Sequence, residues 1–366
     1  MEEPKERFIG IDLAKKTMEV RIMEQGKKVI SWQGKTDPES RIKFIKHLKA
    51  GDKVFIEVCE LASKIAREIK ESTKADVYLL NARQLHIIWN TYKKTDAEDA
   101  LKIARLGMRI PVEELPIVPM PSKEEEELRA VVHELNSIKK ERVYCINRLH
   151  AIYTGGGITT LTKKDLKTDV MRKESAKQLT ERRLAQALRI HKRINLLEEQ
   201  IDEVEDEQAS LVNKNETAKY IMSIPGIGVG FAAVYAAFVG NGERFSNSRQ
   251  LSNYSGLVPK VDQSGDKAYY GGINKASCSA IRRVAVLAAW ALTRSKHGGS
   301  LLEKYEKKVK ERGKLVAIVM LARRMVELCY ILVKNRSYYD NGELTDENPK
   351  LKKLQNKVAK KEGKVA

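Results

Sequence analysis

The first hundred residues alternate between short apolar runs and longer amphipathic stretches. Residues 7–13 (RFIGIDL) and 53–57 (KVFIE) are apolar, partly β-branched runs of strand length, a pattern typical of buried strands. The first run carries Asp12 near its end, and the second ends on Glu57. An unpaired carboxylate at the end of a buried strand costs free energy, so each of these acids needs a partner.

Further elements between and after these runs complete a domain. The predicted elements, in order, are a hairpin around residues 25–26, a helix from 37 to about 50, a helix at 61–70 and a strand at 75–80. Asp37 is the expected N-cap of the first helix, with Pro38 at its first position. Strands that alternate with helices after an opening hairpin indicate a mixed α/β domain, which we assign to residues 1–110.

Residues 81–106 have a helical pattern that contains two more acids. The segment KTDAEDALKIARL places Asp96 and Asp99 three residues apart on one helix face. The domain therefore offers four carboxylates, two on strands and two on a helix turn. In the simpler alternative, Asp96 and Asp99 are solvated acids in the first turn of a helix, where they suit the helix dipole.

A proline-punctuated linker and two long helices are predicted for residues 111–215. From Leu128 to Ile152, and again from Ala187 to Leu211, apolar residues recur at spacings of three and four. Three consecutive glycines, at 155–157, end the first helix. Two heptad-like helices in sequence predict a coiled-coil pair, either a hairpin within one chain or an arm that joins two chains.

Residues 216–344 are predicted to form a mainly α-helical C-terminal domain. The segment IPGIG at 224–228 precedes an alanine-rich helix and resembles a helix-hairpin-helix turn, in which the backbone N–H groups of Gly226 and Gly228 can hold a phosphate. Its alternative is a tight corner between two helices. A loop-rich stretch follows, and we expect the lysine-rich tail, 345–366, to be disordered.

The charge of the chain points to a polyanionic partner. The formal net charge is +19, and Lys and Arg are spread over most of the 366 residues. This composition favours binding to nucleic-acid phosphates, with an anionic membrane surface as the second candidate. We take four basic residues as candidate nucleic-acid contacts: Lys94, Lys275, Arg282 and Arg283.

Cysteines and hydropathy narrow the class of protein. The four cysteines are isolated, without zinc-ligand spacing, which argues against a zinc site and a disulfide scaffold and fits a reducing, cytoplasmic compartment. The first residues are polar, unlike a signal peptide. The longest apolar run, near 229–239, is too short to cross a bilayer, so we expect no membrane association.

Four carboxylates in a basic protein suggest a metal site. Carboxylate oxygens are preferred ligands of Mg²⁺ and Mn²⁺, and two such ions about 4 Å apart assist phosphodiester chemistry. The sequence thus predicts a divalent-metal site formed by four acids: Asp12, Glu57, Asp96 and Asp99.

A serine nucleophile is the weaker prediction. Ser264, in QSGDK, and Ser255, in YSGL, both precede glycines in the loop-rich stretch, and no histidine lies close in sequence to activate either hydroxyl. From the residues alone the two serines are equivalent candidates.

The ordered set of motifs resembles one family over most of the chain. FIGIDLAK, FIEVCELASKIAREI, and NARQ followed by KTDAEDALKIARL are similar to the acidic segments of insertion-sequence transposases of the one-ten family. IPGIG, RFSNSRQLSNYSGLVP, QSG and GGINK followed by IRR are similar to the C-terminal domain of that family in order and spacing.

The resemblance implies a fold, an activity and partners. The N-terminal domain would be ribonuclease H-like (RuvC-like) with a DEDD acid set, and Asp12, Glu57, Asp96 and Asp99 would bind the divalent metal. Ser264 would attack the scissile phosphate and form a phosphoserine link to DNA. A non-coding bridge RNA would pair with donor and target DNA, and dimers or tetramers would combine the acids of one protomer with the serine domain of another. Such a protein would act in the prokaryotic cytoplasm, at the nucleoid.

Three other functions compete with this interpretation. A stand-alone RuvC-like endonuclease that cleaves DNA junctions would need only the four acids. A sugar-kinase or actin-like ATPase would need glycine-rich phosphate loops, and here Leu13-Ala14-Lys15 follows the first acid instead. A non-enzymatic nucleic-acid binder would have no use for the acids or the serine.

Overall fold

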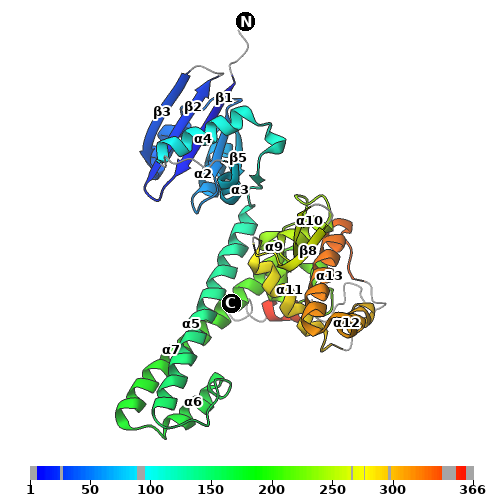
Figure 1. Cartoon of the computed structure of the whole chain (residues 1–366). Coiled ribbons are helices and arrows are strands. Elements are labelled where there is room, and N and C mark those ends of the chain that lie inside the picture. Colours follow the sequence, from blue (N-terminus) through cyan, green and yellow to red (C-terminus); the bar gives the residue numbers. More distant parts are fainter. Residues whose placement is uncertain are drawn as a thin grey trace. The chain divides into compact units, whose positions relative to one another are not determined.

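The computed structural model describes residues 6–24, 28–88, 95–264, 267–275, 277–295, 298–339 and 352–359. The chain divides into two compact units, Met1–Ser122 and Lys123–Ala366. Figure 1 shows the α/β character of the first unit and the helical character of the second. Within the described residues, no helix is long and apolar enough to span a bilayer.

The first unit is built on a sheet with strand order β3-β2-β1-β4-β5-β6. The strands are β1 (Arg7–Leu13), β2 (Thr17–Glu24), β3 (Lys28–Lys35), β4 (Lys53–Glu57), β5 (Asp76–Leu80) and β6 (Ile117–Val118). Its helices are α1 (Pro38–Ile45), α2 (Ala62–Ser72), α3 (Ala82–Ile88), α4 (Asp96–Arg109) and the short 3-10 helix η1 (Val112–Glu114). The three central strands, β1, β4 and β5, run parallel, and β2 and β6 run antiparallel to their neighbours.

The sequence predicted most of these elements, and the differences have local reasons. Asp37 caps α1 as expected, its Oδ1 accepting from the Ser40 N–H at 2.9 Å, but the helix ends at Ile45, well before residue 50. We expected residues 111–121 to be a linker. Part of that segment is instead strand β6, which pairs with β5 and so belongs to the sheet.

Alternating side chains divide the core of the first unit into two layers. Ile9 and Ile11 of β1 pack with α1 and α2 on one face of the sheet, whereas Phe8 packs with α4 on the other. In β4, Phe55 lies on the same face as Phe8. Because side chains alternate along a strand, Gly10, Asp12 and Glu57 also belong to the face that α4 covers.

The second unit begins with an antiparallel helical hairpin. Its helices are α5 (Lys123–Gly155) and α7 (Glu181–Lys214), joined through the short helix η2 (Asp165–Lys167) and α6 (Asp169–Ala176). The predicted apolar positions of α5 and α7 share one core, and ion pairs at 2.6 Å join Lys139 to Glu205 and Arg142 to Glu198. The heptad-like helices thus pair within one chain. Helix α6 lies in a connection for which we predicted no helix.

A buried charge network holds the connection onto the hairpin. The Arg172 side chain is fully buried and donates to Glu198 Oε2 and Asn195 Oδ1, both at 2.8 Å. The Tyr153 hydroxyl donates to the Arg172 carbonyl oxygen at 2.9 Å and lies 3.2 Å from His191 Nε2. Burial raises the pKa of Tyr153 to about 12.

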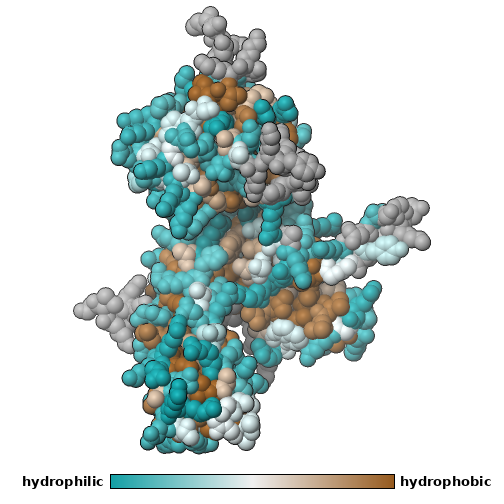
Figure 2. All heavy atoms as spheres, turned by 60° about the vertical axis from the view of Figure 1, so that its left-hand side comes forward, coloured by the Kyte–Doolittle hydropathy of each residue, from teal (hydrophilic) through white to brown (hydrophobic). Residues whose placement is uncertain are grey.

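A helical body completes the second unit. Its elements are α8 (Glu216–Met222), α9 (Val229–Phe238), α10 (Ser248–Tyr254), β7 (Pro259–Ser264), β8 (Lys267–Ile273), α11 (Ser279–Leu292), α12 (Gly299–Arg312) and α13 (Lys314–Asn335). The stretch that we expected to be loop-rich contains α10 and a β7–β8 hairpin. The core combines α9 with faces of α11 and α13. Figure 2 shows hydrophobic side chains (brown) at several points of a mostly hydrophilic surface.

The expectation of a disordered tail is wrong in its described part. Residues 352–359 form a helix, Leu354 is buried in the core of the second unit, and Lys357 Nζ lies 2.7 Å from Asp206 Oδ1. The other residues of 345–366 lie outside the described part of the chain. The lysine-rich composition hid the apolar positions Leu354 and Val358, which pack this helix against the core.

Candidate functional site

Two of the predicted acids lie at the same end of neighbouring strands. Asp12 is near the C-terminal end of β1 and Glu57 is the last residue of β4. The strands are parallel, with Gly10 opposite Phe55 and Ile11 opposite Ile56, so the next positions along this register are Asp12 and Glu57. Both side chains are half-buried and belong to the face covered by α4.

Glycine lets α4 approach this end of the sheet closely. A Cβ atom at Gly10 would collide with the Ala100 carbonyl oxygen and the Ala104 backbone nitrogen. Because Ala100 follows Asp99 directly, this contact fixes the first turn of α4 near β1. Thr95 caps that turn, with its Oγ1 accepting from the Glu98 N–H at 3.3 Å. At the other end of α4, Gly107 lies directly against the Phe55 ring in the same way.

The pKa of Asp12 is affected by the other three acids. Burial, followed by the charges of Asp96, Glu57 and Asp99, raises the pKa of Asp12 to about 6. A like charge acts on a carboxyl group in this way only at short range. This shift agrees with the register of β1 and β4 and with the contact of α4 at Gly10, which bring the four acids to one end of the sheet.

The acids do not form a finished coordination sphere. Within the described residues, no three Asp, Glu, His or Cys side chains lie close enough together to hold an ion as they stand. Lys102 Nζ lies 2.7 Å from Asp99 Oδ1 and counters the charge of that carboxylate. Lys102 was not among the residues predicted from the sequence, although its spacing of three residues from Asp99 on a helix is a recognised ion-pair signal.

The two candidate serines have different surroundings. Ser255 follows α10 and is fully buried, and its Oγ donates to the Leu251 carbonyl oxygen at 2.7 Å. Ser264 is the last residue of β7, opposite Lys267 at the turn end of the β7–β8 hairpin. The side chain of Ser264 lies outside the described part of the structure.

The IPGIG segment forms a tight turn between α8 and α9. Gly226 has φ +85°, a conformation that favours glycine. A Cβ on it would lie 2.8 Å from the Ala288 carbonyl oxygen, so the turn packs directly on α11. Gly228 is exposed at the N-cap of α9. The turn therefore presents the backbone of Gly228, while Gly226 fixes its position.

The predicted basic contacts are distributed over the second unit. Lys275 and Arg283 are exposed, and Arg283 Nη2 donates to Asn136 Oδ1 at 2.6 Å. Arg282 is half-buried, and its Nη1 donates to the Asn274 carbonyl oxygen at 2.9 Å and to Ser277 Oγ at 2.8 Å. Arg282 thus holds the loop before α11, a role that the sequence did not reveal. Lys94 lies outside the described residues.

Comparisons with known proteins agree on one family. Residues 9–155 match a family profile of DEDD type described as "Transposase", and residues 218–306 match the profile "Transposase IS116/IS110/IS902 family". The two matches together cover more than half of the chain, and the DEDD type of the first indicates the use of a divalent metal.

Individual relatives agree with the profiles. The chain is 24% identical over 346 residues to the transposase for insertion sequence element IS1111A of Coxiella burnetii, with 92% of each chain covered. It is 28% identical over 170 residues to the transposase for insertion sequence element IS1328 of Yersinia enterocolitica. This match covers 46% of this chain and about half (51%) of that protein. The pilin gene-inverting protein of Moraxella lacunata is 21% identical over 353 residues, or 91% of this chain and 97% of that one. The protein therefore belongs to the IS110 family of transposases, and DNA transposase activity follows from this membership.

Proposed function

We propose that this protein is an RNA-guided DNA transposase that cuts and rejoins strands through Ser264, assisted by Mg²⁺ or Mn²⁺ at Asp12, Glu57, Asp96 and Asp99. The observation that carries the proposal is the placement of the acids at one end of the sheet: Asp12 and Glu57 lie at the same end of neighbouring parallel strands, and Gly10 brings the first turn of α4 against β1. Burial, followed by the charges of the other three acids, raises the pKa of Asp12 to about 6, in keeping with this placement. The central parallel strands beside an antiparallel hairpin support a ribonuclease H-like fold for the first unit.

The donor set fits a hard divalent cation. The four acids offer oxygen ligands only, and carboxylates that repel one another are stabilised by a cation. Asp12, Glu57 and Asp96 would hold it, and Asp99 would join them when its carboxylate leaves Lys102. When bound, the cation would offset negative charge at a DNA phosphate.

The contacts of Ser255 favour Ser264 as the nucleophile. The Ser255 hydroxyl is buried and already donates to a backbone carbonyl, so it is poorly placed to reach DNA. In the proposed step the Ser264 Oγ forms a bond to the scissile phosphorus, and the bond from phosphorus to the leaving strand oxygen breaks. The hydroxyl proton passes to a base, and the leaving oxygen gains a proton. Rejoining reverses this exchange with a different strand.

The partners follow from the same proposal. The net charge of +19 suits a particle that contains both DNA and a guide RNA, because each phosphate contact releases counterions. A bridge RNA would choose donor and target by base pairing. We propose a homodimer or homotetramer, in which the acids of one protomer serve the serine of another.

A covalent adduct tests the proposal directly. Full-length protein with its co-purifying RNA is incubated with labelled DNA and Mg²⁺, denatured, and examined for DNA that stays bound to protein. We expect an adduct with the wild type and with Ser255→Ala, and none with Ser264→Ala. Metal-dependent cleavage without any adduct would instead favour the stand-alone endonuclease.

A further inference from the structure

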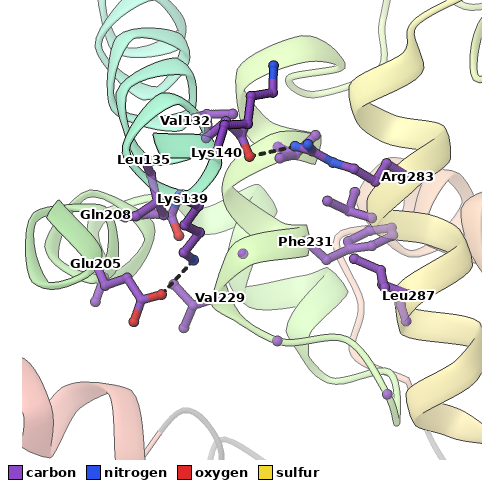
Figure 3. Close-up of a pocket in the computed structure, with 18 of the residues that line it drawn as sticks. Val132, Leu135, Lys139, Lys140, Glu205, Gln208, Val229, Phe231, Arg283 and Leu287 are labelled. Atoms are coloured by element: carbon purple, nitrogen blue, oxygen red, sulfur yellow. Dashed lines mark hydrogen bonds and ion pairs between the residues drawn. The ribbon is translucent and has the colours of Figure 1, made fainter. Parts of the chain in front are cut away.

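A cavity of about 830 Å³ lies within the second unit (Figure 3), whereas the four acids belong to the first. Its walls come from α5 and α7 on one side and from α9 and α11 on the other, with Lys357 from the helix 352–359. The volume falls within the range of about 300–1,000 Å³ that is usual for small-molecule sites.

The floor of the cavity is apolar. Val132 and Leu135 of α5 face Phe231 of α9 and Leu287 of α11 across it. Leu287 is 60% exposed and Val143, at the edge, is 55% exposed. Large apolar side chains that stay in contact with water around one hollow favour a ligand with an apolar surface of its own.

The rim of the cavity carries positive charge. Lys139 and Lys357 are paired with Glu205 at 2.6 Å and with Asp206 at 2.7 Å. Lys140 and Arg283 have no carboxylate partner in the described part of the chain. Arg283 donates instead to the neutral Asn136 amide, which leaves its charge uncompensated. The rim therefore favours an anionic group.

Glycines open the backbone to the cavity where α9 begins. A Cβ at Gly228 or Gly230 would meet no atom within 4 Å, so packing does not require glycine at either position. Glycine weakens a helix, and a glycine N-cap supplies no side-chain oxygen to the first N–H groups. The Phe231 N–H donates to the Gly228 carbonyl oxygen at 3.1 Å, whereas the N–H groups of Val229 and Gly230, in the first turn of the helix, can meet a ligand that approaches the bare backbone.

We propose that this cavity binds one unpaired nucleotide of a nucleic-acid strand. The base lies against Phe231 and Leu287, and its phosphate lies at the N-terminus of α9 near Lys140 and Arg283. Planar bases pack on aromatic and apolar side chains, and phosphates accept from helix N-termini and cations. The inference rests on the proposed function, because it takes nucleic acid as the substrate.

Two variants at the glycines separate binding from folding. Gly230→Leu fills the cavity with a better helix former at a position where added atoms meet open space. Gly228→Asp adds a helix cap but places a carboxylate where the phosphate would lie. Both variants should melt at or above the wild-type temperature. Ser137→Leu, at an exposed position of α5 outside the cavity lining, is the control for an added leucine.

The experiment uses full-length protein freed of nucleic acid by high salt. Its probes are a single-stranded oligonucleotide with 5-iodouracil, the same strand in a duplex, and uridine monophosphate. We expect light-induced crosslinks at Phe231 and its neighbours from the single strand. We also expect affinity for that strand to fall about tenfold in Gly230→Leu and Gly228→Asp, and to be unchanged in Ser137→Leu.

Other results would contradict the proposal or the function on which it rests. Crosslinks elsewhere, or wild-type affinity in both glycine variants, would overturn the proposal. Equal losses for duplex and single strand would show a phosphate contact without a base pocket and would also overturn it. Uridine monophosphate binding as tightly as the strand would assign the cavity to a free nucleotide. If the wild type bound none of the probes, the proposed function itself would fail.

Discussion

The acids at the sheet edge of the first unit and the ion pairs in the hairpin of the second unit are both clusters of charged side chains. Around Asp12 the neighbouring charges have the same sign, and they raise its pKa. Around Arg172 they have opposite signs, and Glu198 and Asn195 accept hydrogen bonds from its guanidinium. The first cluster is half-buried or exposed, whereas the Arg172 side chain is fully buried.

This difference separates a structural cluster from a functional one. Opposite charges that satisfy one another hold a connection in place and need no ligand. Like charges held together by packing destabilise the fold until something neutralises them. The close contact of α4 with Gly10 maintains that repulsion, as the proposed cation site requires.

The largest expected effect is the loss of strand transfer in Asp12→Asn. We expect activity to fall more than 100-fold, because even residues that only support a metal ligand contribute about 10–100-fold. Recombination of a donor and a target plasmid measures it. Asp76→Asn, at the start of β5 and thus at the opposite end of the sheet, is the matched control and should stay active. Normal activity in Asp12→Asn would remove the acids from the mechanism.

Glu198→Gln should cause the largest loss of stability. It removes the nearer of two carboxylates beside the buried Arg172 guanidinium, while Asp169 Oδ1 stays at 3.7 Å. Loss of a carboxylate partner costs about 3–5 kcal/mol for a fully buried pair. Because the Glu198 side chain is 30% exposed, we expect about 2–3 kcal/mol of unfolding free energy. Denaturant unfolding measures the change. The control is Glu199→Gln, on the exposed face of α7, which should change stability by less than about 0.5 kcal/mol. Similar losses in both variants would show that the contacts of Glu198 with Arg172 do not cause the larger loss.

Gly10→Ala tests whether close packing creates the repulsion. The new methyl group would collide with the backbone of α4, at a cost of about 1–3 kcal/mol as the helix moves outward. The pKa of Asp12 should then fall towards its usual range, because Asp96 and Asp99 move away. Carboxyl-carbon NMR of Asp12 gives that pKa, and an unchanged value in a destabilised protein would contradict the argument.

The first unit should become less stable as pH rises from about 4 to 6. Because the pKa of Asp12 is raised to about 6, the folded chain binds this proton more tightly than the unfolded chain in that window. Asp12→Asn removes the effect, and since the carboxyl group is half-exposed we expect a gain of only about 1 kcal/mol at pH 7 without metal. Thermal melting across this pH range, in the presence of a chelator, compares the two proteins.

The stability of the α5–α7 hairpin should instead increase as pH rises, and this is the smallest of the expected effects. Burial, together with the charge of Arg172, lowers the pKa of His191, so the unfolded chain binds that proton more readily. The neutral imidazole of His191 contributes about 1 kcal/mol or less to the stability of the hairpin. This contribution is complete above the unfolded pKa of about 6.5 and is lost as pH falls through the folded pKa. Hydrogen exchange of α7 against pH measures it. A His191→Gln variant with the same pH dependence would exclude this residue as the cause.

The sequence was most informative where side-chain pattern and chemistry coincide. Strand-length apolar runs that carry Asp12 and Glu57 predicted both the strands and their acids, and Asp37 correctly marked the start of α1. The sequence was least informative where a contact involves backbone groups rather than a pattern of side chains. The β7–β8 hairpin follows no clear alternation, and Arg282 holds a loop carbonyl oxygen that no pattern of side chains encodes.

Charge composition led to a wrong prediction for the C-terminal tail, and the charges predicted around the acids lacked one lysine. The composition of the tail around Leu354 is typical of a basic, unstructured segment, yet Leu354 and Val358 pack a helix against the core. Lys102 beside Asp99 could have been expected from helix spacing. The burial of Ser255 could not be read from the sequence, and the role of Ser264 stays a prediction.

The most direct test of the account is a Mn²⁺ titration of the full-length protein, freed of nucleic acid and followed by electron paramagnetic resonance. If the four acids form a cation site, the wild type should remove Mn²⁺ from solution, and Mg²⁺ should displace it. Asp12→Asn should lose this binding, while Asp76→Asn keeps it. Equal Mn²⁺ binding by the wild type and Asp12→Asn, or none by either, would contradict the central claim that these carboxylates converge to hold a divalent ion.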